Sequence, residues 1–168
     1  MTPTVCLSSP VDMLSAVPYM LGFHPTDSIV VLGLRDDALV FQLRGDLPKP
    51  HEVRDFATYY ARVVQRQQVD AAMLAGYGEA ASVTPVVFAT ARALVRRRIT
   101  VVEAVRAHRG RFWSYLCGSP RCCPPEGKPY DVSSSRVAAQ ATVSGYVALP
   151  SRSDLERRLA PLSGPPRT

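Results

Sequence analysis

Three cysteines stand close together in the second half of the sequence, at Cys117, Cys122 and Cys123. Thiolate sulfur binds zinc, and a zinc site usually takes about four thiolate or imidazole ligands with roughly two to four residues between paired cysteines. The spacing here departs from that pattern, and His24 or Cys6 would have to complete the set through space. Zinc at the three cysteines is therefore one hypothesis. There are three alternatives. The first is a disulfide from Cys117 to one of the other two cysteines, the second is a nucleophilic thiol, and the third is a set of buried, unreactive thiols.

The cysteines lead into a stretch that is stiffened by proline. Pro124, Pro125 and Pro129 restrict the backbone, and Gly127 permits a positive φ. A segment of this kind loses little entropy when it becomes ordered. It suits either a preformed rim of a binding site or a rigid plug over the sheet.

Residues 113–131 also carry the side chains that we expect to bind a ligand. Two aromatic residues alternate along the strand before the cysteines, so one face of that strand packs on the core and the other is free to line a pocket. Polar groups after the cysteines offer hydrogen-bond acceptors. The expected binding residues are Trp113, Tyr115, Glu126, Tyr130 and Asp131.

A second group of polar residues precedes the first expected strand. His24 and Asp27 stand three positions apart in a loop, where a histidine and a carboxylate could orient each other for acid–base chemistry. His24, Asp27 and Glu126 are therefore the catalytic candidates, with Asp131 as a further carboxylate. The competing interpretation is that Asp27 caps a turn and His24 bonds to the loop backbone. The sequence has no phosphate-binding loop of the Gly-x4-Gly-Lys type, no dinucleotide motif and no serine nucleophile elbow.

Hydrophobic periodicity predicts the elements that must position these residues. A first helix starts at the cap Ser9 and ends between Pro18 and Gly22. Ser82 is expected to cap a second long helix, which ends at Arg98. The predicted strands are residues 28–34, 38–44, 70–77, 99–107 and 111–116, with Leu39, Phe41 and Leu43 on one face of the second. The other predicted helices are residues 52–67, 136–144 and 152–159.

This order predicts an α/β fold with a mixed sheet of about five strands, built from two hairpins plus parallel crossovers and covered by helices. Residues 1–160 are expected to form a single domain, and the proline-rich residues 161–168 a disordered tail. Gly76 and Gly78 flank Tyr77 at the end of the third strand, where open α/β sheets usually keep their ligand loops.

The composition is that of a globular protein without a membrane segment. Hydrophobic residues make up 46 % of the 168 residues and charged residues 20 %. No uncharged stretch reaches the roughly 20 residues of a membrane-spanning helix, and no signal-peptide pattern opens the chain, so we expect a cytoplasmic location. A reducing compartment disfavours structural disulfides among the four cysteines.

The formal net charge of +6 allows weak binding of nucleic acid. The arginines that could contribute are Arg96, Arg97, Arg98, Arg106 and Arg109. The basic residues do not interleave with aromatic residues expected at the surface, as they do in single-strand binders. Positive charge at the end of a helix also suits the helix dipole, which explains the triple arginine without a ligand.

Two stretches of the sequence resemble a known family. The run SPVDMLSAVPYMLGFHPTDS at residues 9–28 is similar to the N-terminal signature of an actinobacterial family called Domain of Unknown Function 4192. The runs WSYLC at residues 113–117 and CCPPEGKPYD at residues 122–131 are similar to its second signature. The resemblance covers about residues 7–160 and implies an actinobacterial protein, with no assigned catalytic residue. Members are often longer, so an end at Thr168 suggests a short member or a truncated chain.

We expect a binding or regulatory module, in which the loops of residues 23–27 and 113–131 form a surface for a small molecule or a protein. The alternative is a hydrolase or nuclease-like enzyme that uses His24 and Asp27 with Glu126 and Asp131. Nucleic-acid binding is a weaker alternative. The two signature loops are expected to meet in the fold.

Overall fold

The computed structural model describes residues 9–161 of the chain. Within this range, six strands form one mixed sheet, and five α-helices and one short 3-10 helix accompany it. The strands are β1 (Ser28–Arg35), β2 (Ala38–Asp46), β3 (Ala71–Tyr77), β4 (Thr100–His108), β5 (Arg111–Ser114) and β6 (Lys128–Pro129). The helices are α1 (Pro10–Leu21), η1 (Pro50–Glu52), α2 (Val53–Arg66), α3 (Ala80–Arg96), α4 (Arg136–Val143) and α5 (Arg152–Leu159). None of these helices combines the length and apolarity needed to cross a membrane.

The strand order across the sheet is β2-β1-β3-β4-β5-β6. Among the strands described, β3 and β4 form the one parallel pair, and the helix α3 connects them. The other neighbours are antiparallel, in the hairpins β1–β2 and β4–β5 and in the pairs β1–β3 and β5–β6. The prediction of two hairpins joined by helical crossovers is therefore confirmed.

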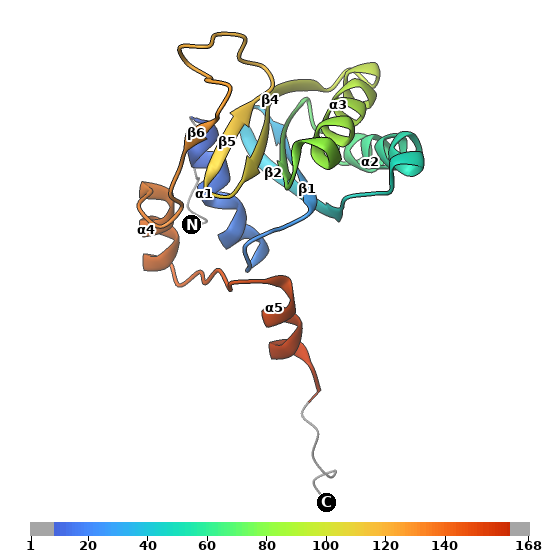
Figure 1. Cartoon of the computed structure of the whole chain (residues 1–168). Helices are drawn as coiled ribbons and strands as arrows, with labels where there is room; N and C mark the ends of the chain where they lie inside the picture. The colour runs from blue at the N-terminus through green and yellow to red at the C-terminus, as the bar shows by residue number, and fades with distance from the viewer. Residues whose placement is uncertain (1–8, 162–168) are drawn as a thin grey trace, which may run out of the picture.

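Helices cover both faces of the sheet (Figure 1). One face packs against α2 and α3, and its core centres on Val31 and Leu74. The other face packs against α1, and its core includes Met13, Val17 and Val30. The central strands β1 and β3 are buried along nearly their whole length because helices lie on both sides of them.

The sheet has one strand more than the sequence predicted. The strand β6 consists of Lys128 and Pro129, which pair with Phe112 and Arg111 of β5. Proline cannot donate a backbone hydrogen bond, so it is tolerated in a strand mainly at a sheet edge, which is the position of β6. A pairing of two residues that includes a proline has no periodic pattern in the sequence, and this is why the segment was expected to be a loop.

The helix α3 begins three residues before the predicted position. Its first residue is Ala80 and its N-cap is Glu79, whereas Ser82 was expected to be the cap and lies in the first helical turn. The strand β3 ends at Tyr77 and Gly78 turns the chain with φ +134°, so the helix can start at once on the good helix former Ala80. The predicted caps Ser9 of α1 and Ser151 of α5 are confirmed by their hydrogen bonds to Asp12 and Asp154.

A β-bulge changes the face on which Leu39 lies. Gly33 pairs with Phe41 and Leu34 pairs with Leu39, so Val40 is the extra residue in β2. Phe41 contacts the core under α2 and α3, whereas Leu39 contacts the core under α1. The prediction that both lie on one face was wrong, because one extra residue moves the following side chains to the opposite face.

Candidate functional site

A cavity of about 220 Å³ lies where the two parallel strands end. Its walls are residues 25–27 before β1, Tyr77 and Gly78 at the end of β3, residues 107–109 at the end of β4, and Tyr130 after β6. Because β3 and β4 run in the same direction, their carboxyl ends meet at one edge of the sheet. Open α/β sheets usually bind their ligands at that edge.

Tyr77 lines this cavity and carries a buried hydroxyl group. The residue is 6 % exposed, and its hydroxyl oxygen has no hydrogen-bond partner within residues 9–161. Burial raises the pKa of Tyr77 well above the usual value of a tyrosine, and the neighbouring Tyr130 raises it further. The hydroxyl therefore keeps its proton at physiological pH. A buried polar group without a hydrogen-bond partner lowers the stability of the fold by about 1–3 kcal/mol, so its presence calls for an explanation.

The carboxylate of Asp27 lies at the same wall. Asp27 has a left-handed backbone with φ 41°, and its carbonyl oxygen accepts a hydrogen bond of 3.0 Å from the Leu47 amide. Its Oδ1 atom lies so close to Gly78 that a Cβ atom there would come within 3.0 Å of it. Gly78 therefore allows the carboxylate to approach the end of β3.

A contact between a histidine and a carboxylate borders the cavity at the end of β4. The Nε2 atom of His108 lies 3.0 Å from the Oε1 atom of Glu79, the residue that caps α3. The side chain of His108 is 24 % exposed and that of Glu79 is 67 % exposed, so the pair lies at the protein surface. Arg109 follows with φ 48° in the turn to β5.

The structure brings together residues from both signature loops. Asp27 and Tyr130 line the same cavity, which places the two loops side by side. His24, Glu126 and Asp131 are not among the residues that line it.

His24 is exposed and belongs to a segment held by backbone bonds. Its amide donates a hydrogen bond of 2.9 Å to the carbonyl oxygen of Leu149, and the Leu149 amide donates one of 2.8 Å to the carbonyl of Gly22. These bonds form an isolated parallel bridge between Phe23 and Leu149. The loop of residues 23–27 is therefore tied to the chain between α4 and α5.

Asp131 organises the approach to α4. Its carboxylate accepts hydrogen bonds from the amide of Ser133 at 2.9 Å and from the hydroxyl of Ser133 at 2.7 Å. These bonds lower the pKa of Asp131 below the usual value. Glu126 is exposed, and its carbonyl oxygen accepts a hydrogen bond of 3.4 Å from Arg111. Asp131 therefore acts on its own loop.

Trp113 braces the loop that carries the cysteines. Its Nε1 atom donates a hydrogen bond of 2.9 Å to the carbonyl oxygen of Pro125. Its ring lies against Gly127, where a Cβ atom would come within 2.5 Å of ring carbon. The guanidinium carbon of Arg106 stands 3.7 Å from the centre of the ring, which is a cation–π contact. Trp113 therefore joins the loop to the end of β4.

Tyr115, another of the expected binding residues, packs against α3. Its hydroxyl forms a hydrogen bond of 2.7 Å with the hydroxyl of Thr84, and its ring lies 5.1 Å from that of Phe88. Burial raises the pKa of Tyr115, while the contacts with Thr84 and Arg106 lower it less strongly. This arrangement fixes the chain just before the cysteines.

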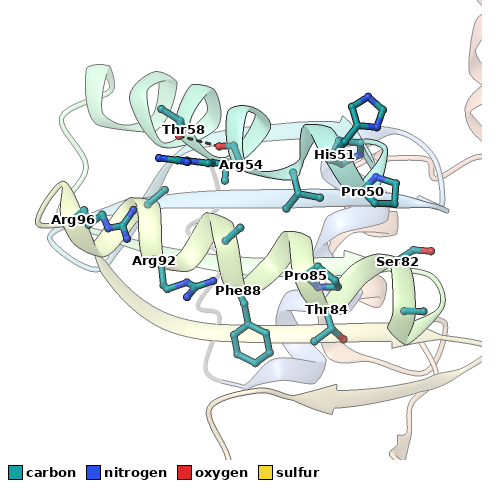
Figure 2. A pocket seen from close by; sticks show the side chains of 16 residues that line it. Pro50, His51, Arg54, Thr58, Ser82, Thr84, Pro85, Phe88, Arg92 and Arg96 are labelled. Carbon is teal, nitrogen blue, oxygen red and sulfur yellow. Dashed lines mark hydrogen bonds between the residues drawn. The ribbon is translucent and has the colours of Figure 1, made fainter.

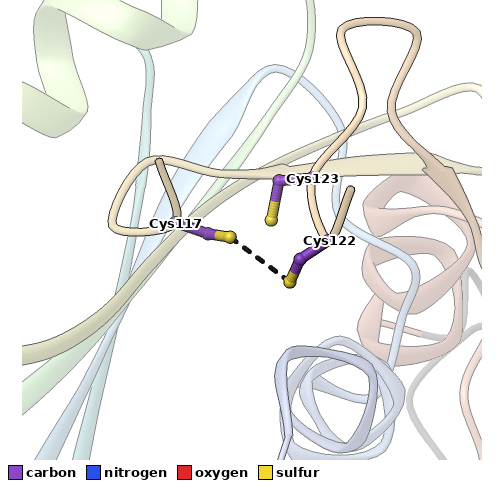
Figure 3. A group of neighbouring side chains, drawn as sticks. All are labelled: Cys117, Cys122 and Cys123. Carbon is purple, nitrogen blue, oxygen red and sulfur yellow. Dashed lines mark hydrogen bonds between the residues drawn. The ribbon is translucent and has the colours of Figure 1, made fainter. Parts of the chain in front are cut away.

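The three cysteines between β5 and β6 are free thiols whose sulfur atoms converge (Figure 3). The Sγ atoms of Cys117 and Cys122 are 3.4 Å apart, which is a contact and not a bond. The hydrogen bond with Cys123 is the largest effect that lowers the pKa of Cys117, and the same contact raises the pKa of Cys123 to about 12. His24 is not among the ligand atoms of this cluster, and Cys6 lies outside the described residues.

A groove of about 1090 Å³ lies between α2 and α3 on the opposite face of the molecule from α1 (Figures 1 and 2). Its lining includes Arg54, Arg92 and Arg96 and contains no aspartate or glutamate. Phe88, which is 46 % exposed, lies in the same lining. The groove therefore places one partly exposed aromatic residue in a lining that also carries three arginines.

The five arginines named from the sequence do not share one surface feature. Arg96 lines the groove, while Arg97 and Arg98 form the turn after α3. Arg106 donates a hydrogen bond of 3.3 Å to the carbonyl oxygen of Gly78, and Arg109 lies at the wall of the small cavity. A binding surface for a polyanion would therefore use Arg54 and Arg92, which sequence reasoning did not select.

Sequence reasoning also missed Tyr77 and His108 as functional candidates. The signal for Tyr77 was its place between two glycines at the end of a buried strand. His108 follows directly after the predicted strand of residues 99–107. The parallel pairing of these two strands makes their ends adjacent, so a topological argument could have selected both residues.

The comparisons with known proteins identify a family and no activity. The model of the family described as "Domain of unknown function (DUF4192)" matches residues 10–168. The match spans nearly the whole chain, so the protein belongs to this family, as the resemblance of its two signature runs implied. No curated protein sequence matches the chain.

Proposed function

We propose that this member of the family is a small-molecule-binding module whose ligand occupies the cavity at the ends of β3 and β4. The buried hydroxyl of Tyr77, which has no partner within residues 9–161, is the observation that carries the proposal. The site also combines groups from both signature loops, Asp27 and Tyr130. Such a convergence of polar groups in a concave site at a sheet edge is typical of ligand pockets.

The size and chemistry of the cavity define the class of ligand. Its volume of about 220 Å³ is below the roughly 300–1,000 Å³ of pockets for drug-sized molecules, so the ligand is a small metabolite. Tyr77 and Arg109 offer donors for a carboxylate or carbonyl oxygen, and Asp27 offers an acceptor for an amine or hydroxyl. We therefore propose a small polar metabolite that carries both kinds of group. The free thiols of the chain suit a reducing, cytoplasmic location for this module.

Substitution of Tyr77 with phenylalanine separates ligand binding from stability. The variant keeps the ring but removes the buried hydroxyl, so we expect the free protein to become more stable by about 1–3 kcal/mol. Binding should weaken about tenfold, because one hydrogen bond to the ligand is lost. Chemical denaturation measures the first effect, and amide shifts in NMR titrations with small amino and hydroxy acids measure the second.

Tyr146→Phe is the matched control, because Tyr146 is half exposed and does not line the cavity. It should leave both quantities unchanged. Ligand-induced shifts that avoid residues 25–27, 77–78 and 107–109, or equal binding by Tyr77→Phe and the unmodified protein, would refute the proposal.

A second candidate function is the binding of single-stranded nucleic acid in the groove between α2 and α3. Its support is that Arg54, Arg92 and Arg96 line the groove together with the partly exposed Phe88, because single-strand binders combine basic grooves with stacking aromatic side chains.

The salt dependence of oligonucleotide binding tests this candidate. Loss of one phosphate contact in Arg92→Gln should reduce the magnitude of the slope of log K against log salt by about 0.7, as measured by fluorescence anisotropy. Arg136→Gln removes the same charge from α4 and should leave the slope unchanged. If the two variants have equal slopes, the groove does not bind the strand.

A further inference from the structure

The loop between β5 and β6 brings three sulfur atoms to one place. The ligand atoms of Cys117, Cys122 and Cys123 all lie within 4.8 Å of one another, although four residues separate the first cysteine from the second. Figure 3 shows the three side chains pointing toward a common space. Cys122 is exposed, so an ion can reach this space from solvent.

A tight turn produces the convergence. The carbonyl oxygen of Ser119 accepts hydrogen bonds from the amides of Cys122 at 3.1 Å and Cys123 at 2.7 Å. These two bonds fold the chain back toward Cys117. Because consecutive cysteines follow the turn, both sulfur atoms can approach the first one.

The turn is held between fixed supports. Before it, Tyr115 is bonded to α3 through Thr84. After it, Pro125 accepts the hydrogen bond of Trp113, and the Gly127 amide donates one of 2.9 Å to the carbonyl of Pro124. The three thiols are therefore positioned by the rest of the fold, which reduces the entropy lost when a ligand binds them all.

We propose that Cys117, Cys122 and Cys123 form a three-thiolate site for Zn²⁺ with one coordination position left for a water molecule or an external ligand. Tetrahedral zinc with bonds of about 2.3 Å places its sulfur ligands about 3.8 Å apart. The contact of 3.4 Å and the limit of 4.8 Å in this cluster bracket that value, so small side-chain rotations complete the geometry. The protons of the thiols pass to solvent when the ion binds.

The surroundings of the cluster favour a cation over a disulfide. A disulfide would use two of the three sulfur atoms and leave the third without a role, whereas a metal ion uses them all. Three thiolates with Zn²⁺ carry a net charge of −1. The basic residue Arg121 belongs to the same loop, and Lys128 follows the loop in β6. Three protein ligands with an open fourth position are the usual composition of a reactive zinc site. The proposal is independent of the function assigned to the cavity.

Metal titration of the full, reduced chain tests the site. We expect one equivalent of Zn²⁺ to bind and to protect Cys117, Cys122 and Cys123 from alkylation by iodoacetamide, as read by peptide mass spectrometry. Co²⁺ bound in place of Zn²⁺ should give thiolate-to-cobalt charge-transfer absorption. Replacement of any one of the three cysteines with serine should weaken zinc affinity by more than about 100-fold, since loss of an outer-shell partner alone weakens it by about 10–100-fold.

Ser119→Ala is the matched control, because it keeps the carbonyl group that forms the turn and removes a side chain of the same loop. It should bind zinc as the unmodified chain does, and circular dichroism should show that all four variants are folded. The proposal is overturned if reduced protein binds no zinc, if the three serine variants keep the original affinity, or if the cobalt spectrum lacks thiolate charge transfer.

Discussion

Gly76→Ala should lower the free energy of unfolding by about 3 kcal/mol, at the upper end of the range for an overpacked core. Gly76 lies in β3 directly under α3, and a Cβ atom there would come within 2.2 Å of Val83 Cγ1 and 3.0 Å of Val87 Cγ2. Both valines are buried, so the helix itself must move. Thermal unfolding followed by circular dichroism should show a fall in Tm of about 9 °C.

Two further variants test whether the contact with Val83 causes this loss of stability. Gly118→Ala adds the same methyl group where no atom lies within 4 Å, so its stability should be close to that of the unmodified protein. Val83→Ala should recover part of the loss when combined with Gly76→Ala, with a coupling energy of about 1 kcal/mol. Additive effects of these two substitutions would show that the contact between Gly76 and Val83 is not the cause.

Trp113→Ala should lower the free energy of unfolding by about 2 kcal/mol, less than for a fully buried tryptophan because the side chain is half-buried. The substitution removes the hydrogen bond to Pro125, the contact with Gly127 and the surface on which Arg106 stacks. The substitution should affect the loop more than the rest of the fold. Amide hydrogen exchange in residues 115–127 should become much faster, while exchange in β1 and β3 should change only as much as the loss of overall stability requires.

Trp113→Phe separates the contribution of the ring contacts from that of the hydrogen bond to Pro125. Phenylalanine keeps a ring for Arg106 and Gly127 but cannot donate to Pro125, so about 1 kcal/mol should be lost. Equal exchange rates of residues 115–127 in Trp113→Ala and the unmodified chain would mean that this side chain does not hold the loop.

Local sequence patterns predicted most of the secondary structure correctly. The uncharged, β-branched run in β1 and the helical spacing of apolar residues in α2 report burial directly, because each element must hide its own apolar face. Features without such a pattern were missed. The strand β6 arises from pairing with β5, and the bulge at Val40 arises from the register of β2 against β1. Both depend on how one strand pairs with its neighbour, which the residues of the strand alone do not determine.

The candidate site was predictable in part. Residue types alone marked Cys117, Cys122 and Cys123, and the sequence placed Asp27 and Tyr130 in two loops that were expected to meet. The spacing of the cysteines was a poor guide to their geometry, because a turn around the Ser119 carbonyl determines where the sulfur atoms lie. The usual spacing of two to four residues between zinc-binding cysteines belongs to other turns than this one.

The sequence alone determined which segments are buried and which residues can carry chemistry, since burial and side-chain chemistry are properties of single residues and their near neighbours. Only the tertiary structure decided which of them act together. The parallel pairing of β3 and β4 placed Tyr77 beside His108, and both residues line the cavity, whereas His24 does not. The packing of α2 against α3 brought Arg54 and Arg92 into the lining of one groove. Such proximity comes from contacts between segments that are far apart in the chain, and no local pattern encodes them.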